Sequence, residues 1–160
     1  MREARLAHLP VADKLAPRTD YEAKFSLQYS VAAMLVYGQV GVATYTPEAI
    51  TDRRVLDLAK RVTYEIKDYS TWPASIPGGA RIRLRDGRVL EADLPHQRGG
   101  AENPMPAAEI RAKYRANAAL ALPDPAVEAL EEAVLSLEEQ PDLRAFAALA
   151  EAGVREAVRA

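Results

Sequence analysis

TDYEAKFSLQYSVAAMLVYG, residues 19–38, is the stretch that decides the fold. From Ser30 to Tyr37 almost every side chain is apolar, a pattern that predicts a helix enclosed on all sides and forming the core of its domain. Gly38 stands where helices commonly end, because glycine takes the left-handed terminal conformation without steric cost. The sequence therefore predicts a central buried helix that ends at Gly38.

The start of this helix has two candidates. Thr19, with Glu22 three residues later, forms a capping box, whereas Ser26 offers a second cap directly before the apolar run. If Ser26 is the cap, then Lys24, Ser26 and Tyr29 crowd the positive end of the helix, which attracts anions such as carboxylates. The simpler alternative is a core helix with an ordinary cap, and the sequence leaves both open.

Composition limits the class of protein. With 160 residues the chain makes one domain, or one domain with a helical appendage. It has no cysteine, which excludes disulfides and thiol nucleophiles and is typical of a reducing cytoplasm. No apolar signal region or membrane-spanning run is visible, and a net charge of −2 is too small to indicate nucleic acid binding. We expect a cytoplasmic protein with neither a membrane nor a nucleic acid as partner.

Charge is unevenly distributed along the chain. Residues 1–120 carry a net charge of +4, while residues 121–160 carry −6. This shift predicts a boundary near Leu122-Pro123, with an α+β domain over 1–122 and a helical hairpin over 123–160.

Before the predicted boundary, the residue patterns indicate short mixed elements. Residues 1–18 suggest an irregular arm with a short strand near Leu6. Thr46 precedes proline as a helix cap, and Thr51 is a second expected cap, leading into an amphipathic helix. Val62, Tyr64 and Ile66 alternate with polar residues, which predicts a strand.

Residues 80–94 form the clearest hairpin. Ile82 must share a face with Leu90, and only a three-residue loop, Arg85-Asp86-Gly87, gives that register. Arg81 then lies opposite Glu91, so the arginines belong to a charge-matched sheet face and not to a phosphate patch.

Helices dominate the rest of the chain. One is expected from its cap at Asn103 to Leu120, a second from Pro123 to Gln140, and a third after Pro141. The last two each carry an apolar stripe, which comprises Val127, Leu130, Val134 and Leu137 in one and Phe146, Leu149, Val154 and Val158 in the other. Two helices rarely hide both stripes completely, so this tail is expected to mediate self-association or docking. The predicted fold class is α+β, with a small antiparallel sheet packed with helices on one face and a two-helix tail.

Two motifs resemble the C-terminal part of the MmgE/PrpD family. The first is AKFSLQYSVAAML, similar to the family pattern A-K-F-S-x-x-Y-x-V-A-A, although Gln28 stands where many relatives carry proline. The second runs from Arg98-Gly99 through Asn103-Pro104 to Lys113-Tyr114. The resemblance covers roughly residues 16–118, and family enzymes are several times longer because they also contain a large helical domain.

The resemblance implies chemistry on small polycarboxylates. The family includes 2-methylcitrate dehydratase of propionate catabolism, cis-aconitate decarboxylase and iminodisuccinate epimerase-like enzymes, which use no metal or organic cofactor. Transferred onto matching positions, Tyr29 is the predicted catalytic residue that donates or shuttles a proton. Lys24 and Ser26 are the predicted substrate-binding residues, through an ion pair with a carboxylate and a donated hydroxyl hydrogen bond.

The chain offers little chemistry by itself. His8 and His96 lack partners at diagnostic spacing, and no metal or phosphate-binding motif is present. Two functions are therefore expected. The chain is either part of a lyase or isomerase (a hydro-lyase in the dehydratase case) that needs a helical domain on a separate chain or a homo-oligomer, or a non-catalytic binding or oligomerisation module.

Overall fold

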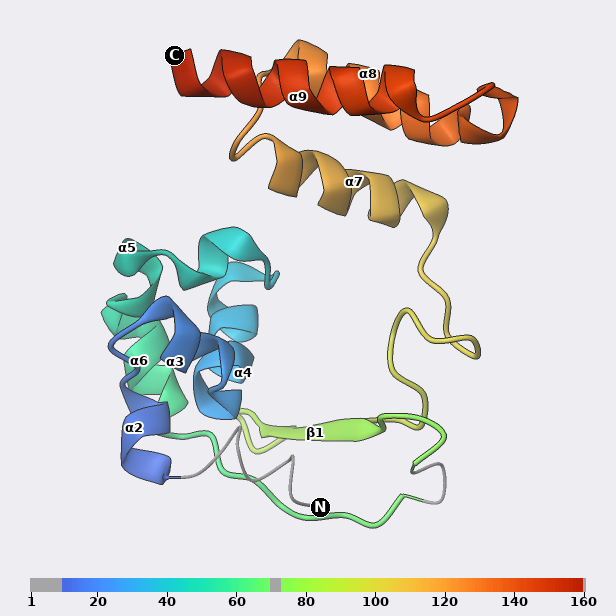
Figure 1. Cartoon of the computed structure of the whole chain (residues 1–160). Coiled ribbons are helices and arrows are strands. Elements are labelled where there is room, and N and C mark those ends of the chain that lie inside the picture. Colours follow the sequence, from blue (N-terminus) through green and yellow to red (C-terminus); the bar gives the residue numbers. More distant parts are fainter. Residues whose placement is uncertain (1–9, 70–72, 160) are drawn as a thin grey trace. The chain divides into compact units, whose positions relative to one another are not determined.

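The computed structural model describes residues 10–69 and 73–159, with side chains described up to residue 151 (Figure 1). It divides into two compact units, residues 1–67 and 68–160. The predicted strand near Leu6 and the side chains of His8, Val154 and Val158 lie outside the described residues. The predicted boundary at Leu122-Pro123 falls within the second unit and stays a prediction.

All the regular secondary structure described in the first unit is helical. Its elements are α2 (Val11–Leu15), α3 (Asp20–Lys24), α4 (Leu27–Tyr37), the 3₁₀ turn η1 (Val42–Tyr45), α5 (Pro47–Ile50) and α6 (Arg53–Ala59). The buried apolar core is made where α4 packs on α6, and comprises Ala23, Tyr29, Ala32, Ala33, Ile50, Val55 and Ala59. Small alanines on α4 let the neighbouring helix approach closely.

Both candidate starts of the central helix are used, each by a different helix. The Thr19 hydroxyl accepts from the Glu22 N–H (3.1 Å) and caps α3, while the Ser26 hydroxyl accepts from the Tyr29 N–H (2.9 Å) and caps α4. The predicted end is confirmed, since Gly38 has φ 76° and its N–H donates to Met34 O at 2.9 Å. The expectation that α4 is enclosed on all sides is wrong, because Met34 remains 49% exposed.

Three local predictions in the first unit are wrong. The arm contains α2, which is too short to show a helical period in the sequence. Thr51 ends α5, and its hydroxyl donates to carbonyls of that helix, so Asp52 caps α6 instead by accepting from the Arg54 N–H at 2.8 Å. Residues 62–66, predicted as a strand, belong to neither of the two described strands, and Ile66 is 64% exposed.

The second unit begins with the predicted hairpin. Strands β1 (Gly78–Arg83) and β2 (Val89–Leu94) are antiparallel, with Ile82 opposite Leu90 and Arg81 opposite Glu91. The three-residue loop is confirmed, because the Leu84 N–H donates to Arg88 O at 2.8 Å and Gly87 takes φ 89°. Both strands are largely exposed.

Helices complete the second unit. They are α7 (Ala107–Ala118), α8 (Asp124–Leu135), the 3₁₀ turn η2 (Leu137–Glu139) and α9 (Arg144–Arg159), and α8 packs against α9 (Figure 1). The expected cap at Asn103 is wrong, because that residue pairs with Gly100 in a β-bridge and α7 begins four residues later. With a helical first unit, an antiparallel hairpin and C-terminal helices, the chain is α+β as predicted.

No described helix combines the length and the apolar character needed to cross a bilayer.

Candidate functional site

Ser26 lies at the centre of the predicted cluster and is completely buried. Its hydroxyl donates to Lys14 O (2.5 Å) at the end of α2 while accepting from the Tyr29 N–H (2.9 Å). A single hydroxyl therefore begins α4 and attaches α2 to it. Both hydrogen-bonding roles of this oxygen are occupied by backbone groups.

Tyr29 is also completely buried. Its hydroxyl donates to Thr44 O at 2.7 Å, and its ring lies 6.1 Å from that of Tyr45. Burial, and then the neighbouring tyrosines Tyr37 and Tyr45, raises the pKa of Tyr29 to about 12, because a phenolate here would lose its hydration. The hydroxyl is neutral at physiological pH, and its proton is directed to a backbone carbonyl.

Lys24 occupies a different environment. Its ammonium lies on the surface and pairs with Asp20 one turn earlier in α3, at 2.8 Å. The structure thus joins Ser26 and Tyr29 through a hydrogen bond and places Lys24 on the solvent side of the preceding helix. The substrate-binding roles of Lys24 and Ser26 and the catalytic role of Tyr29 stay predictions.

Residues of the second motif hold the loop before α7. Gly99 has φ 88° and donates its N–H to Asn103 O at 2.7 Å, while Asn103 Nδ2 donates to His96 O at 3.2 Å. Arg98 forms an ion pair with Glu109. These contacts are those of a folded turn that precedes α7.

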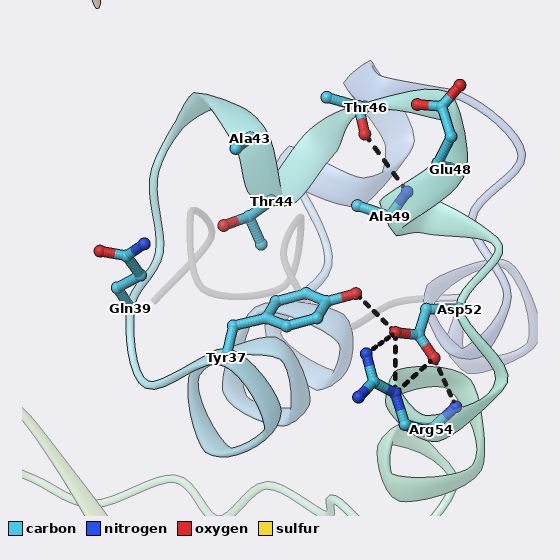
Figure 2. Close-up of a pocket in the computed structure, with 9 residues that line it drawn as sticks. All are labelled: Tyr37, Gln39, Ala43, Thr44, Thr46, Glu48, Ala49, Asp52 and Arg54. Atoms are coloured by element: carbon cyan, nitrogen blue, oxygen red, sulfur yellow. Dashed lines mark hydrogen bonds and ion pairs between the residues drawn. The ribbon is translucent and has the colours of Figure 1, made fainter. Parts of the chain in front are cut away.

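The opposite end of α4 carries a pocket of about 520 Å³ within the first unit (Figure 2). No motif in the sequence indicates this pocket. Its lining comes from the end of α4, η1, α5 and the start of α6, and comprises Tyr37, Gln39, Ala43, Thr44, Thr46, Glu48, Ala49, Asp52 and Arg54.

Asp52 organises the polar side of this pocket. Its carboxylate accepts from the Tyr37 hydroxyl (2.9 Å) and from Arg54 Nη2 (2.6 Å), as Figure 2 shows. The hydrogen bond from the Arg54 side chain, followed by that from its backbone N–H, lowers the pKa of Asp52 well below its usual range. Burial raises the pKa of Tyr37, and the adjacent Asp52 adds to the increase.

The polar groups of the pocket mostly satisfy one another. Asp52 is ionised with both oxygens bonded, while the Arg54 side chain is 72% exposed and its carbon Cζ lies 5.9 Å from the Tyr37 ring centroid. The sequence pattern had indicated Thr51 as this cap, so Asp52 was missed, although aspartate is a residue type that commonly caps helices. The arrangement therefore fixes α6 against α4 and contains no pair of groups poised for acid–base transfer.

Metal chemistry has no visible basis in the described part of the chain. Within residues 10–69 and 73–159, no group of three or more acidic or histidine side chains is placed to hold a metal ion.

Comparison with known proteins defines the class. The family model of the MmgE/PrpD C-terminal domain matches residues 3–139, and the chain belongs to this family. The predicted resemblance is therefore confirmed.

Three individual relatives also match the chain. The chain is 30% identical over 151 residues to the cis-aconitate decarboxylase-like protein oryM of Aspergillus oryzae. The aligned stretch covers 93% of this chain and 31% of that relative. It is 27% identical over 143 residues to the cis-aconitate decarboxylase of Mus musculus (86% of this chain, 28% of the relative). The human enzyme of the same name is 26% identical over 144 residues (86% of this chain, 29% of the relative). The chain spans less than a third of these relatives.

Proposed function

We propose that this chain is the C-terminal part of a lyase that acts on a small polycarboxylate, with cis-aconitate as the first substrate to test. The observation that carries the proposal is the family match over residues 3–139, together with relatives named as cis-aconitate decarboxylases. The sequence resemblance to 2-methylcitrate dehydratase makes dehydration of 2-methylcitrate the next reaction to test. The proposed enzyme acts in the cytoplasm and uses no organic cofactor.

We expect a partner to supply the acid–base groups of the proposed enzyme. The described residues bring together no general acid and general base, and both Ser26 and Tyr29 are engaged by backbone groups. We therefore propose that the catalytic groups come largely from a helical domain on a separate chain, with self-association as the alternative assembly. The helical tail over residues 123–160, with its apolar stripes and with Leu143 61% exposed, is one proposed contact region.

A chimera tests the proposed function. This chain replaces the stretch that it matches in the Aspergillus oryzae relative, and CO₂ release from cis-aconitate is measured for the chimera, the relative and the isolated chain. We expect release by the chimera and none by the isolated chain. Substantial turnover by the isolated chain, abolished by changing one of its residues, would contradict the need for a partner.

Lys24 is the accessible member of the predicted site and has a matched control. Lys24→Gln in the active chimera is expected to raise KM, because the ammonium would exchange its exposed pair with Asp20 for a substrate carboxylate. Lys60 makes an equivalent exposed pair with Asp57 at 2.7 Å, so Lys60→Gln should leave KM unchanged. Equal kinetics for the two variants would remove Lys24 from the proposed site.

One observation favours a second candidate function. Tyr29 is enclosed and its hydroxyl proton points to Thr44 O, as in a purely structural side chain. A non-catalytic module that folds and binds a partner accounts for this geometry. An inactive chimera that is nevertheless folded and associates normally would support that function.

A further inference from the structure

The central helix α4 has two opposite apolar faces, and only one of them is used in the first unit. Tyr29, Ala32 and Ala33 are buried against the rest of that unit. On the other side, Leu27, Met34 and Leu35 (positions i, i+7 and i+8) share one face of the helix and remain between 38% and 49% exposed. A helix that is apolar all round is normally buried all round.

The apolar face continues beyond both ends of the helix, in a stretch of sequence without charged residues. No Asp, Glu, Lys or Arg occurs from Phe25 to Pro47, in a chain with 28% charged residues. Phe25 before the helix and Val40 and Val42 after it are also more than 40% exposed. The exposed apolar residues of α8 differ, because Val134 and Leu135 each lie three residues after a glutamate, Glu131 and Glu132. Charge depletion is typical of the central part of a protein interface.

The face is also rigid before any partner arrives. Ser26 caps the start of α4 and Gly38 its end, and hydrogen bonds from Tyr29 to Thr44 O and from Tyr37 to Asp52 fix the helix from the opposite side. Little conformational freedom would be lost on docking, so binding free energy is retained.

We propose that the Leu27–Met34–Leu35 face of α4 docks onto the part of an MmgE/PrpD enzyme that this chain does not span, at an uncharged apolar surface. The inference rests on the proposed function and names the contact surface. Relatives extend over more than twice the length that this chain matches, so they contain ample additional surface. A charged surface would lose hydration here without gaining an ionic partner.

Size and charge argue against two other occupants. A helix of 11 residues is about 16 Å long, so α4 paired only with its own copy covers far less than the ~800 Å² per partner of a stable interface. A lipid surface favours a basic border around the apolar residues, whereas the cation that precedes this helix in the sequence, Lys24, is paired with Asp20. A large protein partner that surrounds the helix fits both observations.

The test measures binding with two separate chains. The probe is the remainder of the Aspergillus oryzae relative outside the stretch matched by this chain, and the ligand is the full 160-residue chain. Met34→Glu and Leu35→Glu place a charge on the exposed face, and Ile110→Glu on α7, where Ile110 is 55% exposed, is the matched helical control. Circular dichroism and Tm confirm that all variants fold.

We expect Met34→Glu and Leu35→Glu each to weaken binding by at least about tenfold, with Ile110→Glu close to wild type. Equal binding by all variants, or no binding by the wild type, would overturn the proposal. So would a wild-type homodimer that Met34→Glu dissociates, or binding to neutral phosphatidylcholine vesicles that the same change abolishes. Because turnover is not the readout, binding without CO₂ release contradicts only the proposed function, and an active chimera insensitive to Met34→Glu contradicts only the docking surface.

Discussion

The two units of the chain are stabilised in different ways. The first unit encloses a continuous apolar core around Tyr29 and Val55, whereas buried side chains described in the second unit are few, namely Ser75, Val127, Leu130 and Glu131. The second unit relies more on the hydrogen-bonded hairpin and on ion pairs such as Arg115–Glu131, at 2.5 Å. The first unit is thus stabilised mainly by its apolar core, and the second by a helical framework with polar links.

Truncation of an isoleucine in each unit is the strongest test of this contrast. Ile50 is 6% exposed and Ile110 is 55% exposed. Ile50→Ala should lower the free energy of unfolding by about 2–5 kcal/mol, because a core cavity remains. Ile110→Ala should change it by no more than about 0.5 kcal/mol. Urea denaturation followed by circular dichroism measures both, and equal losses would mean that the second unit has a core of comparable strength.

Removal of the Tyr29 hydroxyl tests the polar bond inside the apolar core. Tyr29→Phe leaves the buried Thr44 carbonyl without its donor, so the free energy of unfolding should fall by about 1–3 kcal/mol. Tyr21→Phe, at a residue 68% exposed, is the control and should have almost no effect. Unchanged stability of Tyr29→Phe, combined with lower turnover in the chimera, would instead support the predicted catalytic role.

Alkaline titration probes the same hydroxyl without altering the fold at neutral pH. Tyr29 has a pKa of about 12 in the folded chain against an ordinary value of 10.0, so the folded state holds its proton more tightly. This contribution is complete below pH 10 and is lost as pH rises towards 12. Chemical denaturation at intervals over that range should show a smaller decline for Tyr29→Phe, and parallel declines would contradict the assignment.

The hairpin should show the smallest effect. Arg81 and Glu91 are opposite one another, with Nη2 and Oε1 3.1 Å apart on an exposed face. Glu91→Gln should lower the free energy of unfolding by about 0.2–1 kcal/mol, and less at high salt. Glu132→Gln on α8 serves as a surface control under the same conditions. A salt-independent loss above that range would indicate that the charged face contacts another part of the protein.

Local signals predicted the parts of the fold that depend on neighbours in sequence. Gly38, the Arg85-Asp86-Gly87 loop and the Thr46 cap were predicted because glycine conformation, side-chain alternation and caps act over a few residues. Asn103 was misassigned because its carboxamide bonds to His96 O across a loop, which no local pattern reports. The Thr51 cap prediction failed because the next residue, Asp52, also has a capping side chain and takes that position.

For the candidate site, the sequence predicted which residues are neighbours but not which groups their side chains bind. Adjacency of Ser26 and Tyr29 was predicted, since a cap and the third residue of its helix always meet. Which carbonyls receive their hydroxyl protons could not be predicted, because Lys14 and Thr44 belong to segments placed only by tertiary packing. The pocket beside Tyr37 was missed for the same reason, as its lining converges from four elements.

The three side-chain bonds that tie α4 to the segment after it also set an order of folding. Tyr29 to Thr44, Ser30 to Tyr45 and Tyr37 to Asp52 each join residues 15 positions apart. Closing loops of this length costs little chain entropy, and contacts close in sequence form fast. We therefore expect amides of α4 to gain hydrogen-exchange protection among the first in a refolding pulse experiment, with the exposed face of α4 presented to solvent from that early moment.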